Sequence, residues 1–388
     1  MPTARRLVLA LAAMLLALVV AELGLRALAP ATDRWCLWPP HLDQLSEPLA
    51  DVYPGVTGPS RFRVNSLGLR ADELVPGADP VVLAVGGSTT ECLVLDQSEA
   101  WPRRLQDLLS TGGARAWVGN AGRSGHSTRE HVFQVPALLD TVPDTDVLLV
   151  LAGANDLGLR LKQDADHDPH VLERDDAAAV VIPRAFALHP PAYASHLPWY
   201  KRTELYARAR DAKNRLASRG GAGTEIGPRG QGVARWRDNR AHATELRDAL
   251  PDLRPALDEY RRNLTRLVRA AQERGVAVVL MTQPSLWRDD LDERERALLW
   301  WGGVGDFQAP GARVPFYTAS ALARGIDAYN AVLLEVAAAT GAEALDLAAA
   351  IPRDTSMFFD DMHFTEAGAA RVADVVAAFL TERGLAKP

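Results

Sequence analysis

The chain has 388 residues, of which 48% are hydrophobic and 24% are charged. This composition is typical of a globular protein with enough length to bury one large core or two modest ones, and it argues against a disordered chain. The formal net charge of -6 leaves no broad basic surface, so nucleic acid is not an expected partner.

Residues 1–30 have the pattern of a membrane-targeting helix. Arg5 and Arg6 precede an uninterrupted apolar run at 7–21, and apolar residues predominate up to residue 29. At ~1.5 Å per residue, this stretch is about long enough to cross a ~30 Å hydrocarbon core. The basic residues ahead of it predict a single-pass anchor with the N-terminus inside and the rest of the chain extracytoplasmic. A cleaved signal peptide is the alternative, because the small residues at 29–31 resemble a cleavage site, and either interpretation exports the rest of the chain.

Residues 31–79 are rich in Pro, Gly and Asp, and we expect them to connect this helix to a folded domain at 80–388. They contain Cys36, one of the two cysteines of the chain; the other is Cys92. Two cysteines are too few for a disulfide scaffold and show no metal-ligand spacing. A single bridge between them and two separate thiols both remain open.

From residue 80 onward, short apolar runs alternate with helical patterns. An apolar run bounded by turn residues indicates a strand that is buried on both faces, as in a parallel sheet. We expect five such strands, at 81–85, 115–118, 146–151, 276–281 and 343–347.

The intervals between these runs predict helices. Ser127 begins one of them, because Glu130 follows at the capping-box spacing. Apolar stripes at helical spacing predict two more that end at Gly275 and Gly341, and a last helix over 365–383. Strands that alternate with helices favour a three-layer α/β/α sandwich around a five-stranded parallel sheet.

Two insertions interrupt this alternation. Residues 157–250 are polar and irregular, with glycine-rich stretches at 219–223 and 227–232 that suggest flexible loops. Residues 286–319 carry several aromatic side chains: Trp287, Trp300, Trp301, Phe307, Phe316 and Tyr317. Both insertions follow the carboxyl end of a strand, where open α/β sheets bind their ligands, so we expect both to cover a cleft.

Four polar segments stand at or near the expected strand ends. The first, Gly-Gly-Ser-Thr-Thr at 86–90, places the Ser88 hydroxyl on a tight turn. The second and third, Asn-Ala-Gly-Arg-Ser-Gly at 120–125 and Gly-Ala-Asn-Asp at 153–156, offer an unhindered backbone N–H and a side-chain amide. The fourth is Asp-Asp-Met-His at 360–363, in which a carboxylate three residues before an imidazole can orient that ring and stabilise its protonated form.

In this order, the four segments resemble the sequence blocks of the SGNH/GDSL hydrolase superfamily. The resemblance extends over about 80–380, is weakest in the two insertions, and implies the flavodoxin-like SGNH hydrolase fold. The segment Asn-Ser-Leu-Gly-Leu-Arg at 65–70 is also similar to membrane-anchored bacterial members. The chain departs from the family motif at Gly87, where the motif has Asp, and at Thr89, where it has Leu; this departure affects contacts around the turn and leaves the nucleophile in place.

The resemblance implies a role for each site residue. Ser88 would be the nucleophile, His363 the general base and acid, and Asp360 the carboxylate that orients His363. The backbone N–H groups of Ser88 and Gly122, together with the side-chain amide of Asn155, would form the oxyanion hole.

Other polar residues are weaker candidates. Asp361 and Asp156 stand beside motif residues and are alternative orienting carboxylates, although the spacing favours Asp360. The two histidines within 167–170 are interpreted as part of a solvated loop, because no third metal ligand follows at a regular spacing. Phosphate-binding, dinucleotide-binding and zinc-protease motifs are missing from the sequence, so we expect no cofactor and no metal.

These features predict an exported serine esterase or deacylase that hydrolyses a carboxylic ester, for example an O-acylated carbohydrate or lipid. An O-acyltransferase with the same triad is a close alternative, in which a sugar hydroxyl replaces water and the Trp-rich insertion excludes water. A non-catalytic binding module on the same fold is an alternative of another class. That alternative predicts that the histidine or the carboxylate is missing, yet both are present.

Overall fold

A five-stranded parallel sheet forms the centre of the computed structural model, which describes residues 2–28, 35–110, 115–189, 198–206, 208–209, 212–213 and 226–386. The strands lie in the order β4-β3-β5-β7-β9. Their bounds are Val81–Gly86 for β3, Trp117–Gly122 for β4, Val147–Leu151 for β5, Ala277–Met281 for β7 and Glu343–Leu345 for β9. Because β4 and β5 flank β3 on opposite sides, the strand order reverses at β3, and ligands bind at the carboxyl ends of strands beside such a reversal.

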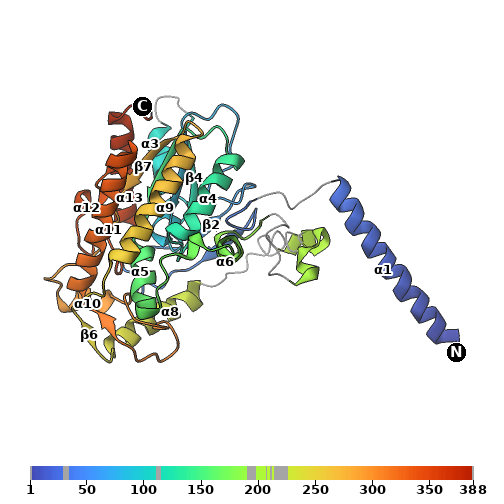
Figure 1. The fold of residues 1–388 in the computed structure, drawn as a ribbon, viewed down its shortest axis with the longest axis horizontal. Helices are drawn as coiled ribbons and strands as arrows, with labels where there is room; N and C mark the ends of the chain where they lie inside the picture. Colours follow the sequence, from blue (N-terminus) through green and yellow to red (C-terminus); the bar gives the residue numbers. More distant parts are fainter. Residues whose placement is uncertain are drawn as a thin grey trace.

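Helices cover both faces of this sheet, as right-handed crossovers between parallel strands require (Figure 1). Helix α3 (Trp101–Leu109) packs against α13 (Glu366–Glu382). Helix α9 (Arg254–Gln272) packs against both α4 (Thr128–Thr141) and α11 (Ala319–Thr340) and forms the other layer with them. The predicted three-layer fold with a five-stranded parallel sheet is confirmed.

Local hydrogen bonds define the predicted helix boundaries. Ser127 caps α4, and its backbone N–H donates to the carboxylate of Glu130 at 2.9 Å, which completes the capping box. Thr365 caps α13 by accepting the N–H of Gly368 at 3.0 Å. Gly341 ends α11 in the left-handed conformation, with φ of 71°.

The second strand of the sheet is longer than its apolar pattern predicts. The pattern predicts a strand at 115–118, but β4 continues to Gly122, so residues 120–122 lie in the strand and not in a turn after it. Small residues allow this extension, because a Cβ at Gly122 would lie 2.2 Å from the backbone nitrogen of Glu91. β4 therefore packs directly against the short helix α2 (Ser88–Glu91), which follows β3.

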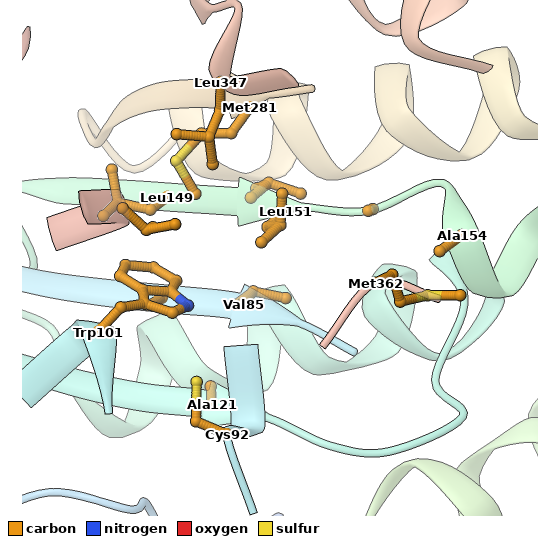
Figure 2. Close-up of a cluster of buried hydrophobic side chains, with 14 of the residues drawn as sticks. Val85, Cys92, Trp101, Ala121, Leu149, Leu151, Ala154, Met281, Leu347 and Met362 are labelled. Carbon is orange, nitrogen blue, oxygen red and sulfur yellow. The ribbon is translucent and has the colours of Figure 1, made fainter. Parts of the chain in front are cut away.

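Apolar side chains from the sheet and its helices interlock in the core (Figure 2). Val85 of β3, Leu149 of β5 and Met281 of β7 are fully buried there. Trp101 at the start of α3 is also fully buried, and its indole N–H donates to the carbonyl of Thr89 at 3.0 Å. Burial of each large apolar side chain contributes roughly 1.5–3 kcal/mol, and the Trp101 hydrogen bond in addition ties α3 to α2.

Residues 35–79, which were expected to be a connector, pack onto the domain. Within them, β1 (Asp43–Ser46) and β2 (Ser60–Arg63) form a two-stranded antiparallel sheet. Leu37 and Leu69 are fully buried in the core of the domain.

Helix α1 (Pro2–Leu28) projects away from the domain in Figure 1. Its stretch Arg5–Ala27 has a mean hydropathy of 2.6 and is not buried in the protein. By length and composition this helix could cross a membrane, and a signal sequence near an N-terminus has the same properties.

The two insertions contain regular elements. In the first, α8 (Ile226–Ala241) includes the glycines at 227–232 that suggested a loop, whereas 219–223 lies outside the described residues. The insertions are joined by β6 (Leu246–Arg247) of the first, which pairs in parallel with β8 (Phe316–Tyr317) of the second. The first insertion and the residues just before it also contain α5 (Ala154–Gln163), η2 (Asp164–Asp166), η3 (Val171–Glu173), α6 (Ala177–Ala185) and η5 (Trp199–Arg202), and the second contains α10 (Glu293–Leu298). Outside the insertions, the short helix α12 (Leu347–Ala350) follows β9.

Candidate active site

The turn after β3 places Ser88 at the first position of α2. Neither glycine ahead of Ser88 leaves room for a side chain. A Cβ at Gly86 would lie 2.6 Å from the carbonyl oxygen of Leu151, and a Cβ at Gly87 would lie 2.3 Å from the amide nitrogen of Asn155. Gly87, at which the chain departs from the family motif, therefore lies directly against the side-chain amide of Asn155.

Ser88, His363 and Asp360 form one continuous hydrogen-bonded chain. The Ser88 Oγ lies 2.7 Å from Nε2 of His363. Nδ1 of the same ring lies 2.8 Å from each carboxylate oxygen of Asp360. With the ring hydrogen on Nδ1, Nε2 can accept the proton of the Ser88 hydroxyl.

Asp360 is 1% exposed and is held by further donors. The backbone N–H groups of Met362 and His363 donate to its Oδ1 at 3.0 and 2.9 Å, and the indole N–H of Trp300 donates to its Oδ2 at 2.9 Å. Burial opposes ionisation of Asp360, but the charge of His363 and these hydrogen bonds lower its pKa below the ordinary value. Burial likewise opposes protonation of His363, but the Asp360 carboxylate raises its pKa. The pair is therefore an ionised carboxylate beside a basic imidazole.

Asp361, the alternative carboxylate, has a different set of partners. Its Oδ1 accepts the indole N–H of Trp287 at 2.8 Å. Its Oδ2 accepts the backbone N–H groups of Trp300 and Trp301 at 2.8 and 3.1 Å. Burial, followed by the charge of Asp360, raises the pKa of Asp361.

Asn155 and Asp156 lie in the first turn of α5. The Asn155 amide donates to the carbonyl of His126 at 2.8 Å, which leaves its second N–H for another acceptor. Asp156 accepts the backbone N–H and the hydroxyl of Thr128 at 3.1 and 2.5 Å, and burial raises its pKa to about 7. Asp156 therefore ties α5 to the start of α4, and among the described residues the carboxylate that bonds His363 is that of Asp360.

The structure does not bring Gly122 to the site. Its N–H donates to Oδ1 of Asn120 at 2.9 Å, and Gly122 does not belong to the wall of the cavity beside Ser88. Gly125 lies in that wall with φ of 77°, and its N–H makes no hydrogen bond within the described part of the chain. The expectation for Gly122 is thus corrected: because β4 continues to residue 122, the turn that faces Ser88 begins only after it.

A cavity of about 550 Å³ opens beside Ser88 and His363. Both insertions contribute to its walls, through α5, α6, α8 and residues 301–308. Lys162 and Arg184 add positive charge to these walls. The apolar residues that line the cavity include Leu93, Val94, Val181, Val233, Trp236 and Phe307. A mostly apolar cavity of this size with a few polar groups is typical of a small-molecule site.

Segment 65–70 supports the nucleophile turn through Arg70. This arginine is 2% exposed, and its guanidinium donates to the carbonyls of Glu91, Cys92 and Leu95 at 2.6, 2.7 and 2.8 Å. Arg70 thus fixes the chain directly after α2, a role that the sequence alone did not indicate.

The remaining candidates lie outside the hydrogen-bonded chain. Among the described residues, no group of three or more His, Cys, Asp or Glu side chains could hold a metal ion. His167 lies 3.4 Å from the carboxylate of Glu259. The thiol of Cys92 donates to the carbonyl of Thr89 at 3.4 Å, and within the described chain no disulfide joins it to Cys36.

A doubly wound α/β sheet that carries a Ser-His-Asp chain at its carboxyl edge defines a serine hydrolase. Residues 84–371 match the model of the GDSL-like Lipase/Acylhydrolase family, and the chain belongs to this family. The protein is therefore an SGNH/GDSL-type serine hydrolase that acts on ester bonds. No curated protein matches the chain.

Several solved structures are similar in fold. TesA is 17% identical, with 78% of this chain and 98% of that chain covered and a TM-score of 0.40. Axe2, an acetylxylan esterase from Geobacillus stearothermophilus, is 16% identical, with 79% and 95% covered and a TM-score of 0.39. LAE5, an α/β hydrolase from the metagenome of Lake Arreo, is 14% identical, with 79% and 96% covered and a TM-score of 0.41.

Proposed function

We propose that the protein is an exported esterase in which Ser88, His363 and Asp360 are the catalytic triad. The observation that carries this proposal is the unbroken chain of hydrogen bonds, 2.7 Å from Ser88 to His363 and 2.8 Å from His363 to Asp360, at the edge of a cavity. A purely binding module has no need for a basic imidazole aligned on a serine hydroxyl, so we favour catalysis over that alternative.

Hydrolysis follows from this geometry in two steps. Ser88 Oγ attacks the ester carbonyl carbon while its proton passes to Nε2 of His363. The tetrahedral intermediate then collapses, the bond to the alcohol oxygen breaks, and His363 protonates the leaving alcohol. Water attacks the resulting acyl-enzyme with His363 again as the base, which releases the carboxylic acid and restores Ser88. Asp360 keeps the hydrogen on Nδ1 of His363 and stabilises the imidazolium.

Three donors support an oxyanion hole: the backbone N–H groups of Ser88 and Gly125 and the second N–H of the Asn155 amide. All three residues line the cavity, and neither backbone N–H is engaged within the described chain. Removal of one such donor typically costs ~2.7–4 kcal/mol of transition-state stabilisation. We therefore expect Asn155→Ala to lower kcat by about 10²- to 10³-fold with little change in KM.

The substrate that fits this cavity is a carboxylic ester of an O-acylated carbohydrate or a lipid. Its apolar walls suit an acyl group, and Lys162 and Arg184 provide polar contacts. A second candidate activity is acyl transfer to a sugar hydroxyl, which is favoured by the aromatic walls formed by Trp236, Trp300 and Phe307 because they exclude water. Product analysis with and without an acceptor alcohol separates the two: transfer yields a new ester, and hydrolysis yields free acid.

We also propose that α1 anchors the enzyme with its catalytic domain on the extracytoplasmic side. Arg5 and Arg6 at the start of the apolar stretch support this orientation. Retention of the full chain in membranes after alkaline extraction supports an anchor, whereas a mature N-terminus near residue 30 contradicts it and supports a cleaved signal peptide.

The triad is tested by labelling the full-length protein with a fluorophosphonate and by measuring cleavage of short-chain 4-nitrophenyl esters. Ser88→Ala should abolish both signals. Ser124→Ala is the matched control, because Ser124 lines the same cavity and its hydroxyl is bonded to Glu91 instead of His363. Labelling that persists in Ser88→Ala refutes the assignment of the nucleophile.

A further inference from the structure

Two adjacent buried carboxylates, Asp360 and Asp361, stand in the turn that carries His363, and Trp300 bonds to both. The indole N–H of Trp300 donates to Asp360 Oδ2 at 2.9 Å, and its backbone N–H donates to Asp361 Oδ2 at 2.8 Å. Both carboxylates are almost completely buried, at 1% and 0% exposure. Trp300 comes from the aromatic insertion between β7 and α11, which lies far from this turn in the sequence.

We propose that Trp300 is a positioning residue that holds the catalytic carboxylate Asp360, and that Asp361 holds Trp300 in place for this purpose. The proposal rests on the proposed triad. It assigns separate tasks to the two adjacent aspartates: Asp360 orients His363, and Asp361 fixes the residue that orients Asp360.

The donors to Asp360 support the first half of the proposal. Its Oδ1 accepts the backbone N–H groups of Met362 and His363, which belong to the same turn. Within the described chain, Trp300 is the donor to Asp360 that comes from outside this turn. Nδ1 of His363 lies between the two carboxylate oxygens, and the Trp300 indole adds a second, fixed donor at Oδ2 that holds the carboxylate plane while the imidazole changes its charge.

The donors to Asp361 support the second half. Its carboxylate accepts backbone N–H groups from Trp300 and Trp301 and the indole N–H of Trp287, and its backbone carbonyl accepts the N–H of Leu286 at 2.9 Å. Four donors from one insertion thus converge on a single buried residue. A buried carboxyl group that accepts several such donors fixes the residues that supply them, so the insertion is held on the turn that carries His363.

The Trp300 ring also lies beside the imidazole that becomes charged during the reaction. Its plane is within 8° of the His363 ring, with centroids 6.3 Å apart, and Trp236 packs on Trp300 at 4.7 Å. The alternative to the proposal is that Trp300 only lines the cavity and does not act on Asp360. A wall contributes to KM, whereas a donor to Asp360 contributes to kcat and to the titration of His363.

The first test is Trp300→Phe in the full-length enzyme, compared with Trp117→Phe. Phe keeps an aromatic ring and removes the N–H. Trp117 is the matched control, because it is buried and its indole N–H donates to the backbone carbonyl of Asp72 at 3.0 Å, away from both aspartates. Thermal unfolding of each variant identifies any loss of fold, and 3-benzothienylalanine at position 300, which has the shape of Trp without the N–H, replaces Phe if that variant is unstable.

We expect Trp300→Phe to lower kcat by on the order of 10- to 100-fold, the effect of a lost hydrogen bond to a charged group, with a smaller change in KM. The NMR titration of His363 should move to higher pH, because a carboxylate with one donor fewer attracts the imidazolium more strongly. The other charged groups that act on His363 and its turn are unchanged in this variant; they are Asp361, Glu91 and Arg240. Trp117→Phe should leave that titration in place.

A kcat within about twofold of the wild type and a shift of less than about 0.2 pH units in Trp300→Phe overturn the role of Trp300. The role of Asp361 is tested by Asp361→Asn alone and together with Trp300→Phe. If Asp361 acts through Trp300, the two losses in kcat are not additive, and full additivity overturns this half. The NMR titration needs no turnover, so an inactive wild-type enzyme would contradict the proposed function while the contact between Trp300 and the His363–Asp360 pair is still measured.

Discussion

Gly87→Ala tests whether the nucleophile turn and the Asn155 amide form one closely packed unit. An added Cβ would lie 2.3 Å from Nδ2 of Asn155, while the next neighbour, the carbonyl oxygen of His126, is 3.5 Å away. The φ of Gly87 is negative, at -86°, so alanine meets no left-handed backbone there. The Asn155 amide is therefore the group that has to move, by about 1 Å to reach ordinary contact, and its 2.8 Å bond to His126 is lost.

The expected magnitude follows from that displacement. Complete loss of an oxyanion donor costs ~2.7–4 kcal/mol, so kcat in Gly87→Ala should fall by up to about 10²- to 10³-fold while the fold stays intact. Steady-state kinetics with a short-chain 4-nitrophenyl ester would compare Gly87→Ala, Asn155→Ala and the double variant. Because both changes remove the same donor, the double variant should be no worse than Asn155→Ala alone.

Gly232→Ala is the matched control for this experiment, since a Cβ at Gly232 meets its nearest neighbour at an ordinary 3.6 Å. A Gly87→Ala enzyme with kcat within about twofold of the wild type refutes the reasoning. So does a double variant in which the two losses simply add, because additivity would mean that the two residues act independently.

Three further predictions follow from buried polar groups. Arg70→Met should lower the free energy of unfolding by at least about 2 kcal/mol in urea titrations, because it leaves the buried carbonyls of Glu91 and Leu95 without a donor and removes one of two donors to Cys92. Exposed Arg63→Met should have little effect, and equal effects of the two variants would contradict this role. Asp360 raises the pKa of His363 above 6.5, and only the neutral imidazole accepts the Ser88 proton. As pH decreases, kcat/KM should therefore fall with an apparent pKa above 6.5. A pH–rate profile whose acidic limb has an apparent pKa below 6.5 counts against this prediction. Burial raises the pKa of Asp156 to about 7 from an ordinary 3.8, so between these pH values the folded protein binds a proton that the unfolded chain has released. The contribution of Asp156 to the free energy of unfolding should therefore decline as pH rises from 3.8 to 7. Asp156→Asn should remove that part of the pH dependence of urea unfolding, and an unchanged pH dependence would refute the assignment.

The fold and the hydrogen-bonded pair of Asp360 and His363 could be predicted because their signals are local. Apolar runs indicate strands without knowledge of their neighbours, and the capping residues Ser127 and Thr365 act within their own helices. The spacing of Asp360 and His363 is also sufficient, because one short turn brings the carboxylate to both the ring and the backbone N–H of the histidine.

That the N–H of Gly122 is engaged within the sheet could not be predicted, because the end of a strand is a non-local property. Gly122 and Gly125 both lie in the same polar segment, and the apolar pattern ends before either of them. The extension of β4 depends on pairing of Gly122 with Gly86 and on close packing against Glu91, which no local pattern records. The sequence signal that favours Gly125 is its position just ahead of the capping residue Ser127, where a left-handed turn suits glycine.

The different hydrogen-bond partners of Asp360 and Asp361 could not be predicted from their spacing either, because they also depend on a segment that is distant in the sequence. Both carboxylates stand close enough to His363 in the chain to orient it, and what separates them is the insertion that supplies donors to each. The aromatic content of residues 286–319 predicted a cover for the cleft, but aromatic content does not indicate that the N–H groups of Trp300 donate to Asp360 and Asp361. If the proposed contact operates, the aromatic insertion is part of the catalytic machinery as well as of the cavity wall, and changes that loosen it should lower kcat before they alter the choice of ester.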